Sequence, residues 1–222
     1  MKKKIAVAIF AHPDDEAFGP AGTIHKLTKD YDVYILCATK GEIGQNSLEN
    51  GKPLPEIRAE ELRSSAKILG VKDVFFLGFT DGTLSNSIYH KLADAIESKL
   101  KELKPELIMT SSPTGGSGHI DHIVVSMVSS YVFERLNFIK EIWYRANTTE
   151  ETDKWKEFPY FVYRPPGIPR SKIDKIVDVS DVWDVRVAAM QAHASQKHDV
   201  IRLTKMREDL PKEEYFMIRK RD

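Results

Sequence analysis

Cysteine is almost absent from this sequence, and neither sign of charge is in excess. Cys37 is the single cysteine among 222 residues, so no disulfide can form within the chain, which is typical of proteins from a reducing compartment. Lysine and arginine together number 33, as do aspartate and glutamate, which gives a formal charge of zero. Nucleic acids and anionic membranes select basic surfaces. We therefore expect neither to be the main partner.

Long apolar runs and nucleotide-binding motifs are lacking as well. The N-terminal apolar run extends only from Ile5 to Ala11 and then meets Pro-Asp-Asp-Glu. A membrane span needs about 18 or more apolar residues, and a secretory leader ends in a small-residue cleavage pattern. No Gly-x-Gly-x-x-Gly follows this run, and the sequence has no Walker lysine loop. These absences predict a cytoplasmic protein without a membrane span and argue against nucleotide binding.

The sequence does contain a repeated alternation of apolar runs and amphipathic stretches. Continuous apolar runs predict strands that are buried on both faces, and stretches with helical spacing follow them. The expected strands are 4–10, 32–38, 73–77 and 106–110, and the expected helices are 18–29, 57–69, 87–103 and 119–132. Four such units in a row predict an α/β fold with a mostly parallel sheet and helices on both faces.

After Asn137 the pattern changes. We expect strands at 139–145, 160–163 and 175–179, a polar connection at 147–156, helices at 183–193 and about 199–207, and a closing edge strand at 215–218. There is no internal repeat and no clear linker. The sequence therefore predicts one domain over residues 1–222, in which 1–135 hold the core units and the site, and 136–222 form a modified C-terminal completion.

The residues that suggest chemistry follow the expected strands. His12, Asp14, Asp15 and Glu16 come directly after the first strand, and His119-Ile-Asp-His122 follows the fourth. In open α/β sheets, functional groups collect beyond the carboxyl ends of the strands. The simpler alternative for the first cluster is helix capping, because aspartate is common at helix N-termini. The two clusters together favour a site.

Histidine and carboxylate without thiolate suit zinc or another divalent metal, such as Fe2+. Two histidines and one carboxylate would leave a position open for water, whose pKa a metal lowers to about 7. Candidate ligands are His12, Asp15 and His122. Asp14 would then be available as a general base, and His119 as an oxyanion donor or an acid. Asp121 could fix the tautomer of a histidine in the site, while Glu16 is expected at the helix start or behind the ligands.

Further polar residues near the same edge are candidates for substrate binding. Arg58 could bind a phosphate or carboxylate, or form a solvent-facing pair with Glu61. Glu42 and Asp81 could hold sugar hydroxyls, or simply be solvated loop residues. His198 is expected at the surface.

The motifs Ala11-His-Pro-Asp-Asp-Glu16 and His119-x-Asp-His122 together resemble those of the PIG-L/LmbE-type N-acetylglucosaminyl deacetylases. Gly22-Thr23, Thr39-x-Gly-Glu42, Arg58-x-x-Glu61, Leu69-Gly70 and Asp81-Gly82 also match in order, so the resemblance covers about the first two thirds of the chain. Ile120 stands where proline is frequent in the second motif, and the loop before it is unusually rich in glycine and serine. Both departures concern substrate shape and loop mobility and leave the ligands intact.

The resemblance implies a Rossmann-like fold and zinc held by His12, Asp15 and His122, with Asp14 as base and His119 as oxyanion donor or acid. It also implies removal of acetyl from N-acetylglucosamine attached to varied aglycones, as in mycothiol, bacillithiol and glycolipid-anchor biosynthesis. The stretch Gln191-Ala-His-Ala-Ser-Gln196 resembles a further family pattern, which we interpret mainly as structural support.

The sequence therefore predicts a zinc-dependent hydrolase that removes the N-acetyl group from an amino-sugar small molecule or glycoconjugate. Two alternatives remain open: a different metal-dependent amidase or phosphoesterase, and a non-catalytic sugar-binding module. The aglycone, the native metal, the roles of His193 and of the loop 164–169, and whether the chain forms a homo-oligomer are left undetermined by the sequence.

Overall fold

The computed structural model describes residues 3–48, 51–155 and 163–221. These residues form a seven-stranded sheet in the order β3-β2-β1-β4-β5-β7-β6. The strands are β1 (Lys4–Phe10), β2 (Tyr31–Cys37), β3 (Asp73–Phe76), β4 (Leu107–Ser111), β5 (Glu141–Ala146), β6 (Lys175–Asp178) and β7 (Glu213–Lys220). The first five in spatial order run parallel, whereas β7 is antiparallel to both β5 and β6. The mostly parallel α/β sheet predicted from the sequence is confirmed.

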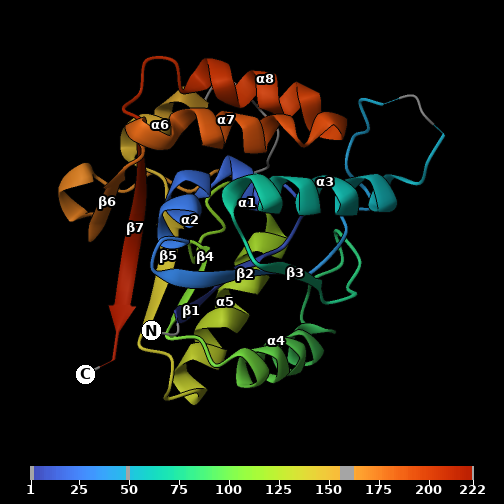
Figure 1. Ribbon diagram of the computed structural model, residues 1–222, viewed down its shortest axis with the longest axis vertical. Coiled ribbons are helices and arrows are strands. Elements are labelled where there is room, and N and C mark those ends of the chain that lie inside the picture. The colour runs from blue at the N-terminus through green and yellow to red at the C-terminus, as the bar shows by residue number, and fades with distance from the viewer. Residues whose placement is uncertain (1–2, 49–50, 156–162, 222) are drawn as a thin grey trace.

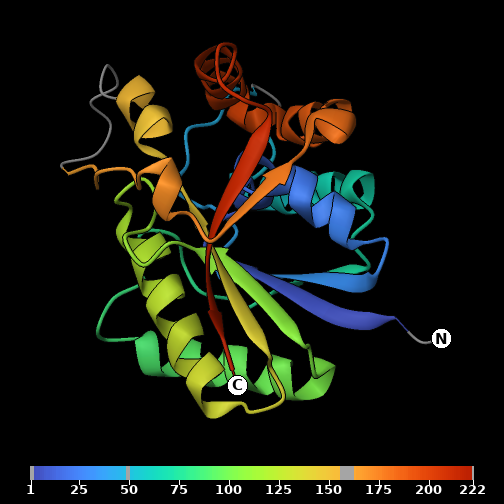
Figure 2. The ribbon, with the colours of Figure 1, turned by 90° about the vertical axis from the view of Figure 1, so that its left-hand side faces the viewer.

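Helices cover both faces of the sheet (Figures 1 and 2). They are α1 (Asp15–Phe18), α2 (Ala21–Leu27), α3 (Leu54–Leu69), α4 (Tyr89–Leu103), α5 (Ile120–Arg135), α6 (Thr149–Trp155), α7 (Trp183–Gln191) and α8 (Lys197–Met206). Short 3-10 helices η1 (Arg170–Lys172), η2 (Ser180–Val182) and η3 (Ala194–Gln196) lie between the C-terminal elements. Within the described residues, no helix is both long and apolar enough to cross a bilayer.

The core has two halves because successive strand residues point to opposite faces. On β1, Ala6, Ala8 and Phe10 pack with residues of α2, α3 and α7, whereas Val7 and Ile9 pack with residues of α4 and α5. All five side chains are at most 3% exposed. This continuous burial explains why β1 has no polar alternation and why the polar residues begin only where the strand ends.

The structure corrects three details of the prediction. The helix expected at 18–29 is the shorter α2, which begins at Ala21 after Gly19 and Pro20 and is thereby separated from α1, since proline lacks the N–H that a continuous helix needs. The polar connection expected at 147–156 contains helix α6.

The strand expected at 215–218 is part of β7, which lies between β5 and β6 rather than at the edge. Apart from Tyr163, the strand expected at 160–163 lies outside the described residues.

Candidate metal centre and active site

The topology opens a crevice between β1 and β4. From β1 the chain proceeds to β2 and β3 on one side, then crosses back to β4 on the other side. Connections therefore leave the carboxyl ends of β1 and β4 in opposite directions, and such a switch point is where ligands bind in open α/β sheets. His12 follows β1, while His119 and His122 stand at the start of α5, just after β4.

Three of the expected ligand atoms converge in this crevice. His12 Nδ1 lies 3.1 Å from His122 Nε2, and His122 Nε2 lies 3.2 Å from Asp15 Oδ1. The other oxygen of Asp15 accepts the backbone N–H groups of Ala11 and His12, at 3.1 and 3.0 Å. The structure thus brings His12 and Asp15 together with His122, which lies 110 residues beyond His12 in the chain.

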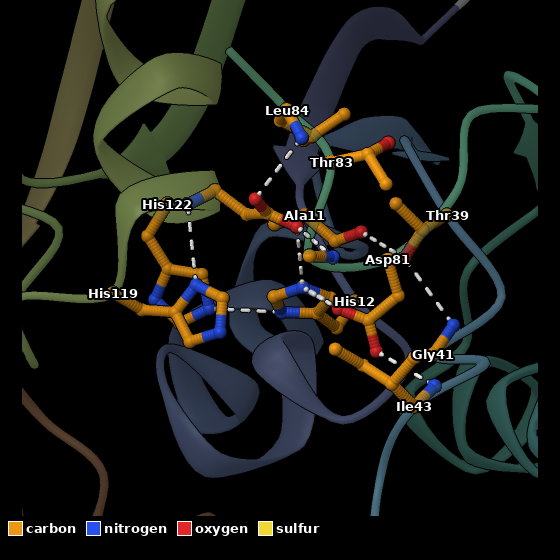
Figure 3. Close-up of polar contacts among 12 residues, drawn as sticks. Ala11, His12, Thr39, Gly41, Ile43, Asp81, Thr83, Leu84, His119 and His122 are labelled. Carbon is orange, nitrogen blue, oxygen red and sulfur yellow. Dashed lines mark hydrogen bonds and ion pairs between the residues drawn. The ribbon is translucent and has the colours of Figure 1, made fainter. Parts of the chain in front are cut away.

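Hydrogen bonds at the far side of each imidazole determine which nitrogen is free to bind a metal. His122 Nδ1 lies 3.1 Å from the carbonyl oxygen of Gly115 and donates to it, which leaves Nε2 with its lone pair. His12 Nε2 faces Asp81 Oδ1 at 2.9 Å and Asp121 Oδ2 at 3.3 Å, which leaves Nδ1 as the lone-pair atom. Carboxylate and carbonyl partners of this kind orient metal-binding histidines. Figure 3 shows His12 between Asp81 and the two histidines of α5.

The crevice favours a positive charge. Burial alone would lower the pKa of His12, but hydrogen bonds to Asp121 and Asp81 and the charge of Asp15 raise that pKa to about 10. Burial would likewise raise the pKa of Asp15, yet His122 and His12 hold it well below its ordinary value. Nδ1 of His12, Nε2 of His122 and the ionised carboxylate of Asp15 face one another, so the donor set fits a divalent metal ion, which would displace a proton from His12 on binding. His12, His119 and His122 also offer donor atoms within 4.8 Å of one another.

Asp14 lies beside these ligands in a left-handed backbone conformation with φ of 109°. Arg58 Nη2 donates to Asp14 Oδ2 at 2.9 Å and to the carbonyl of Pro13 at 2.5 Å. Burial and the nearby Asp15 raise the pKa of Asp14 to about 6, although Arg58 lowers it. The solvent-facing pair of Arg58 with Glu61 that the sequence left open is wrong, because both are buried and Glu61 accepts from Ser195 instead.

Arg58 also explains the glycine in Thr39-x-Gly-Glu42. Its Nη1 donates to the carbonyl of Gly41 at 3.1 Å. A Cβ at Gly41, where φ is +68°, would lie 2.1 Å from that nitrogen. The position needs glycine for both backbone conformation and close approach.

His119 stands at the N-cap of α5, where its Nδ1 accepts the backbone N–H of Asp121 at 3.2 Å. Its Nε2 therefore carries the proton of the neutral ring. Burial lowers the pKa of His119, and His122 and His12 lower it further. A neutral imidazole of this tautomer is a hydrogen-bond donor at Nε2, which suits an oxyanion better than it suits proton donation.

Three further predicted site residues support His12, either directly or through a neighbour. Asp121 accepts the backbone N–H groups of Gly82 and Leu84 at 2.8 and 3.2 Å and so supports His12 from a fixed position. Asp81 faces His12 in the same way, and Glu42 accepts the N–H of Asp81 at 3.0 Å. The structure thus places Asp81 and Glu42 in the support of His12, and their contact with sugar hydroxyls stays a prediction.

A cleft of about 300 Å³ opens over these groups. His12, Asp14, Asp15 and His122 line its floor, together with Arg58, Asp81 and His119. Its far wall comes from the start of α8, including His198, Asp199 and Arg202. His198, which we expected at the surface, therefore borders the cleft.

A buried support behind Asp14 was not predicted in detail. Glu16 accepts from Ser65 Oγ at 2.6 Å, from the backbone N–H of Asp14 at 3.1 Å and from His193 Nε2 at 2.7 Å. His193 is fully buried; burial would lower its pKa, but Glu16 raises it. Glu16 thus lies behind the ligand loop, as expected, and His193 supports that loop from a distance of 177 residues in the chain.

Comparison with known proteins identifies the family. The family described as PIG-L: GlcNAc-PI de-N-acetylase matches residues 7–132, more than half of the chain. A Bacillus subtilis (strain 168) protein named "Probable N-acetyl-alpha-D-glucosaminyl L-malate deacetylase 2" is 31% identical over 207 residues, which cover 91% of this chain and 87% of the relative. This chain belongs to the PIG-L family. The resemblance inferred from the two motifs is confirmed.

Solved structures share the fold of this PIG-L protein. The N,N'-diacetylchitobiose deacetylase from Pyrococcus horikoshii matches with a TM-score of 0.67 and 21% identity, over 98% of this chain and 84% of that chain. A 4-carboxy-2-hydroxymuconate hydratase, GalB from Pseudomonas putida KT2440, matches with a TM-score of 0.70 and 18% identity, over 99% of this chain and 97% of that chain. One scaffold therefore carries different reactions, and function must be argued from the site.

Proposed function

We propose that this protein is a zinc-dependent hydrolase that removes the acetyl group from an N-acetylglucosamine-containing small molecule. Membership of the PIG-L family makes it a hydrolytic N-deacetylase. The observation that carries the metal proposal is the convergence of His12 Nδ1, His122 Nε2 and Asp15 Oδ1. When bound, a divalent ion acidifies a water molecule and polarises a carbonyl oxygen.

Asp14 is the proposed general base. A pKa of about 6 leaves this carboxylate ionised at neutral pH and able to take a proton from the attacking water, since a base is most effective when its pKa lies near the working pH. The Arg58 contact fixes the carboxylate beside the ligands. Protonated Asp14 then returns the proton to the departing amine.

His119 is the proposed oxyanion donor. Its neutral ring holds a proton at Nε2, because Nδ1 accepts from the helix backbone, and a fixed donor of this kind stabilises charge that develops on the acetyl oxygen. Asp81 and Asp121 act through His12, whose ring they hold with Nδ1 toward the metal position. The cleft is the proposed place for the sugar and its aglycone.

A panel of conjugates tests this proposal. Metal-loaded protein is incubated with N-acetylglucosamine joined to L-malate, with N-acetylglucosamine joined to inositol, and with N,N'-diacetylchitobiose; released acetate and free amine are measured. We expect equal amounts of acetate and amine from at least one conjugate. Phosphate release from a parallel set of phosphate esters, without acetate from any conjugate, would contradict the proposal.

A further inference from the structure

Two small pockets adjoin the cleft, and both share Phe18 and Ser117 with its lining. The first, of about 120 Å³, is lined by Asp15 and His122 at one end and by Arg145 at the other. The second, of about 90 Å³, shares Arg145 with the first and continues to Arg164 and Arg207. Both are much smaller than the cleft of about 300 Å³. They have room for a small group, and the sugar has its place in the cleft.

Two arginines share one carboxylate in the second pocket. Arg145 and Arg207 line it together with Glu151, whose carboxylate is the only one among the described residues of the lining. Arg145 Nη2 donates to Glu151 Oε1 at 3.0 Å, and Arg207 Nη2 donates to the same oxygen. One carboxylate oxygen of Glu151 therefore accepts hydrogen bonds from two buried arginines. Buried charges require compensation, so the pocket has capacity for a further anion.

Three guanidinium nitrogens of Arg145 and Arg207 also lack hydrogen-bond partners within the described residues. The side chains of Arg145 and Arg207 are only 8% and 9% exposed. In the part of the chain that the structure describes, Nε and Nη1 of Arg145 and Nη1 of Arg207 are buried without a partner. Each such donor costs free energy unless a ligand satisfies it. The planar guanidinium matches the two oxygens of a carboxylate.

We propose that Arg145 and Arg207, with Arg164 beside them, form a binding site for a small carboxylate next to the cleft. The first pocket adds Phe10, Phe18 and Pro20 to its lining, so a methyl group and a carboxylate can both be accommodated between the metal ligands and Arg145. Acetate fits this combination. The carboxylate has two sources, acetate released by the reaction or an acidic group of the aglycone. The acetate source rests on the proposed function; the site itself rests on the arginines.

Calorimetric titration of the metal-loaded protein with acetate tests the site without turnover. Arg145→Gln and Arg207→Gln are compared with wild type and with Arg135→Gln, a control in which the lost cation pairs with Glu97 on the surface. We expect each pocket variant to weaken acetate binding at least about tenfold, because a charged hydrogen bond is lost, and the control to match wild type. Acetamide, which has no charge, should bind more weakly than acetate to wild type.

Unchanged acetate affinity in both pocket variants would overturn the proposal, because acetate would then bind at the metal alone. If Arg145→Gln does not fold by circular dichroism, Arg207→Gln decides. Failure of deacetylation leaves this calorimetric result unaffected, so the two proposals fail separately.

Kinetics of the same variants distinguish the two sources. If the site takes released acetate, product inhibition by acetate weakens equally with the malate and inositol conjugates as substrates. If it takes the aglycone, KM rises for the malate conjugate and not for the inositol conjugate. Either pattern supports a carboxylate site at Arg145.

Discussion

Asp14 has a backbone conformation that residues other than glycine seldom adopt, and conformations of this kind cost about 1–3 kcal/mol and cluster at active sites. The surrounding contacts hold it there: its N–H donates to Glu16, its carbonyl accepts from Phe18, and its side chain meets Arg58. As a result, the carboxylates of Asp14 and Asp15 point in different directions. Asp15 faces the histidines while Asp14 meets Arg58 beside them.

Replacement of Asp14 tests its role as base. In Asp14→Ala we expect kcat to fall by about 10²- to 10⁴-fold with bound metal retained, because His12, Asp15 and His122 remain. Elemental analysis measures the metal, and acetate release measures kcat. Asp14→Asn serves as the matched control for shape and should be equally inactive. Wild-type turnover in either variant would exclude Asp14 as the base.

His193 is a positioning residue whose effect passes through Glu16 to the backbone of Asp14. In His193→Ala we expect kcat to fall about tenfold or more while metal content is retained, since a misplaced catalytic group slows the reaction. His193→Gln, which can still donate to Glu16, should recover part of the rate. His90→Ala, at an exposed histidine, is the control. If His193→Ala matches wild type in kcat, Asp14 does not depend on this contact.

The convergence of the two motifs could be predicted from the sequence, but the buried contacts behind them could not. His12, Asp15 and His122 follow strands, and strand ends in a parallel sheet meet at one edge. By contrast, nothing in the local sequence pairs Glu16 with His193 or Glu61 with Ser195, because these contacts depend on how α7 and η3 pack against α3. For Arg145 the sequence likewise predicts only a place in a strand.

At the scale of elements, α6 links β5 to α8 through one carboxylate. Glu151 in α6 accepts from Arg145 of β5 and from Arg207, the residue that follows α8. Its other oxygen accepts the N–H of Thr148 at 2.9 Å. Burial would raise the pKa of Glu151, but the two arginines hold it below its ordinary value.

This contact predicts acid sensitivity. A carboxylate with a depressed pKa stabilises the fold fully above its ordinary pKa of about 4.3, and this contribution is lost as pH falls through the folded-state pKa. We therefore expect the free energy of unfolding to fall as the pH is lowered below about 5. Glu151→Gln should lower the free energy of unfolding by about 3–5 kcal/mol at pH 7, because buried arginines lose their charged partner. In this variant the free energy of unfolding should also depend less on pH below about 5.

Chemical denaturation of wild type and Glu151→Gln between pH 3 and pH 7 measures the free energy of unfolding of each. Glu134→Gln, at an exposed carboxylate paired with Arg219, is the control and should follow wild type. Parallel pH profiles for wild type and Glu151→Gln would show that Glu151 does not cause the acid sensitivity.

Elements with strong local signals were predicted well, and those that depend on the rest of the fold were not. β1 begins and ends at the predicted residues, and α3 ends where Gly70 provides a left-handed cap. The presence of α6 and the interior place of β7 could not be predicted locally. β7 depends on pairing with β5 and β6, and α6 is held to β5 by the contact of Glu151 with Arg145.

At the scale of the whole molecule, the N-terminal units and the C-terminal segment share one sheet, since β7 pairs with β5 along six residues. We propose on this basis that residues 1–222 form one domain. The C-terminal segment also contributes to the site: α8 forms a wall of the cleft, and His193 supports the ligand loop. The catalytic motifs of the first part therefore depend on the last part.

The central claim is that His12, Asp15 and His122 hold a metal on which deacetylation depends. Its most direct test is acetate release from the conjugate that wild type cleaves, measured as zinc is added back to metal-depleted protein, with His122→Ala alongside. We predict that activity rises linearly and levels off at about one zinc per chain, and that His122→Ala binds little metal and releases little acetate. Full acetate release by metal-depleted protein, or undiminished metal content in His122→Ala, would contradict the claim.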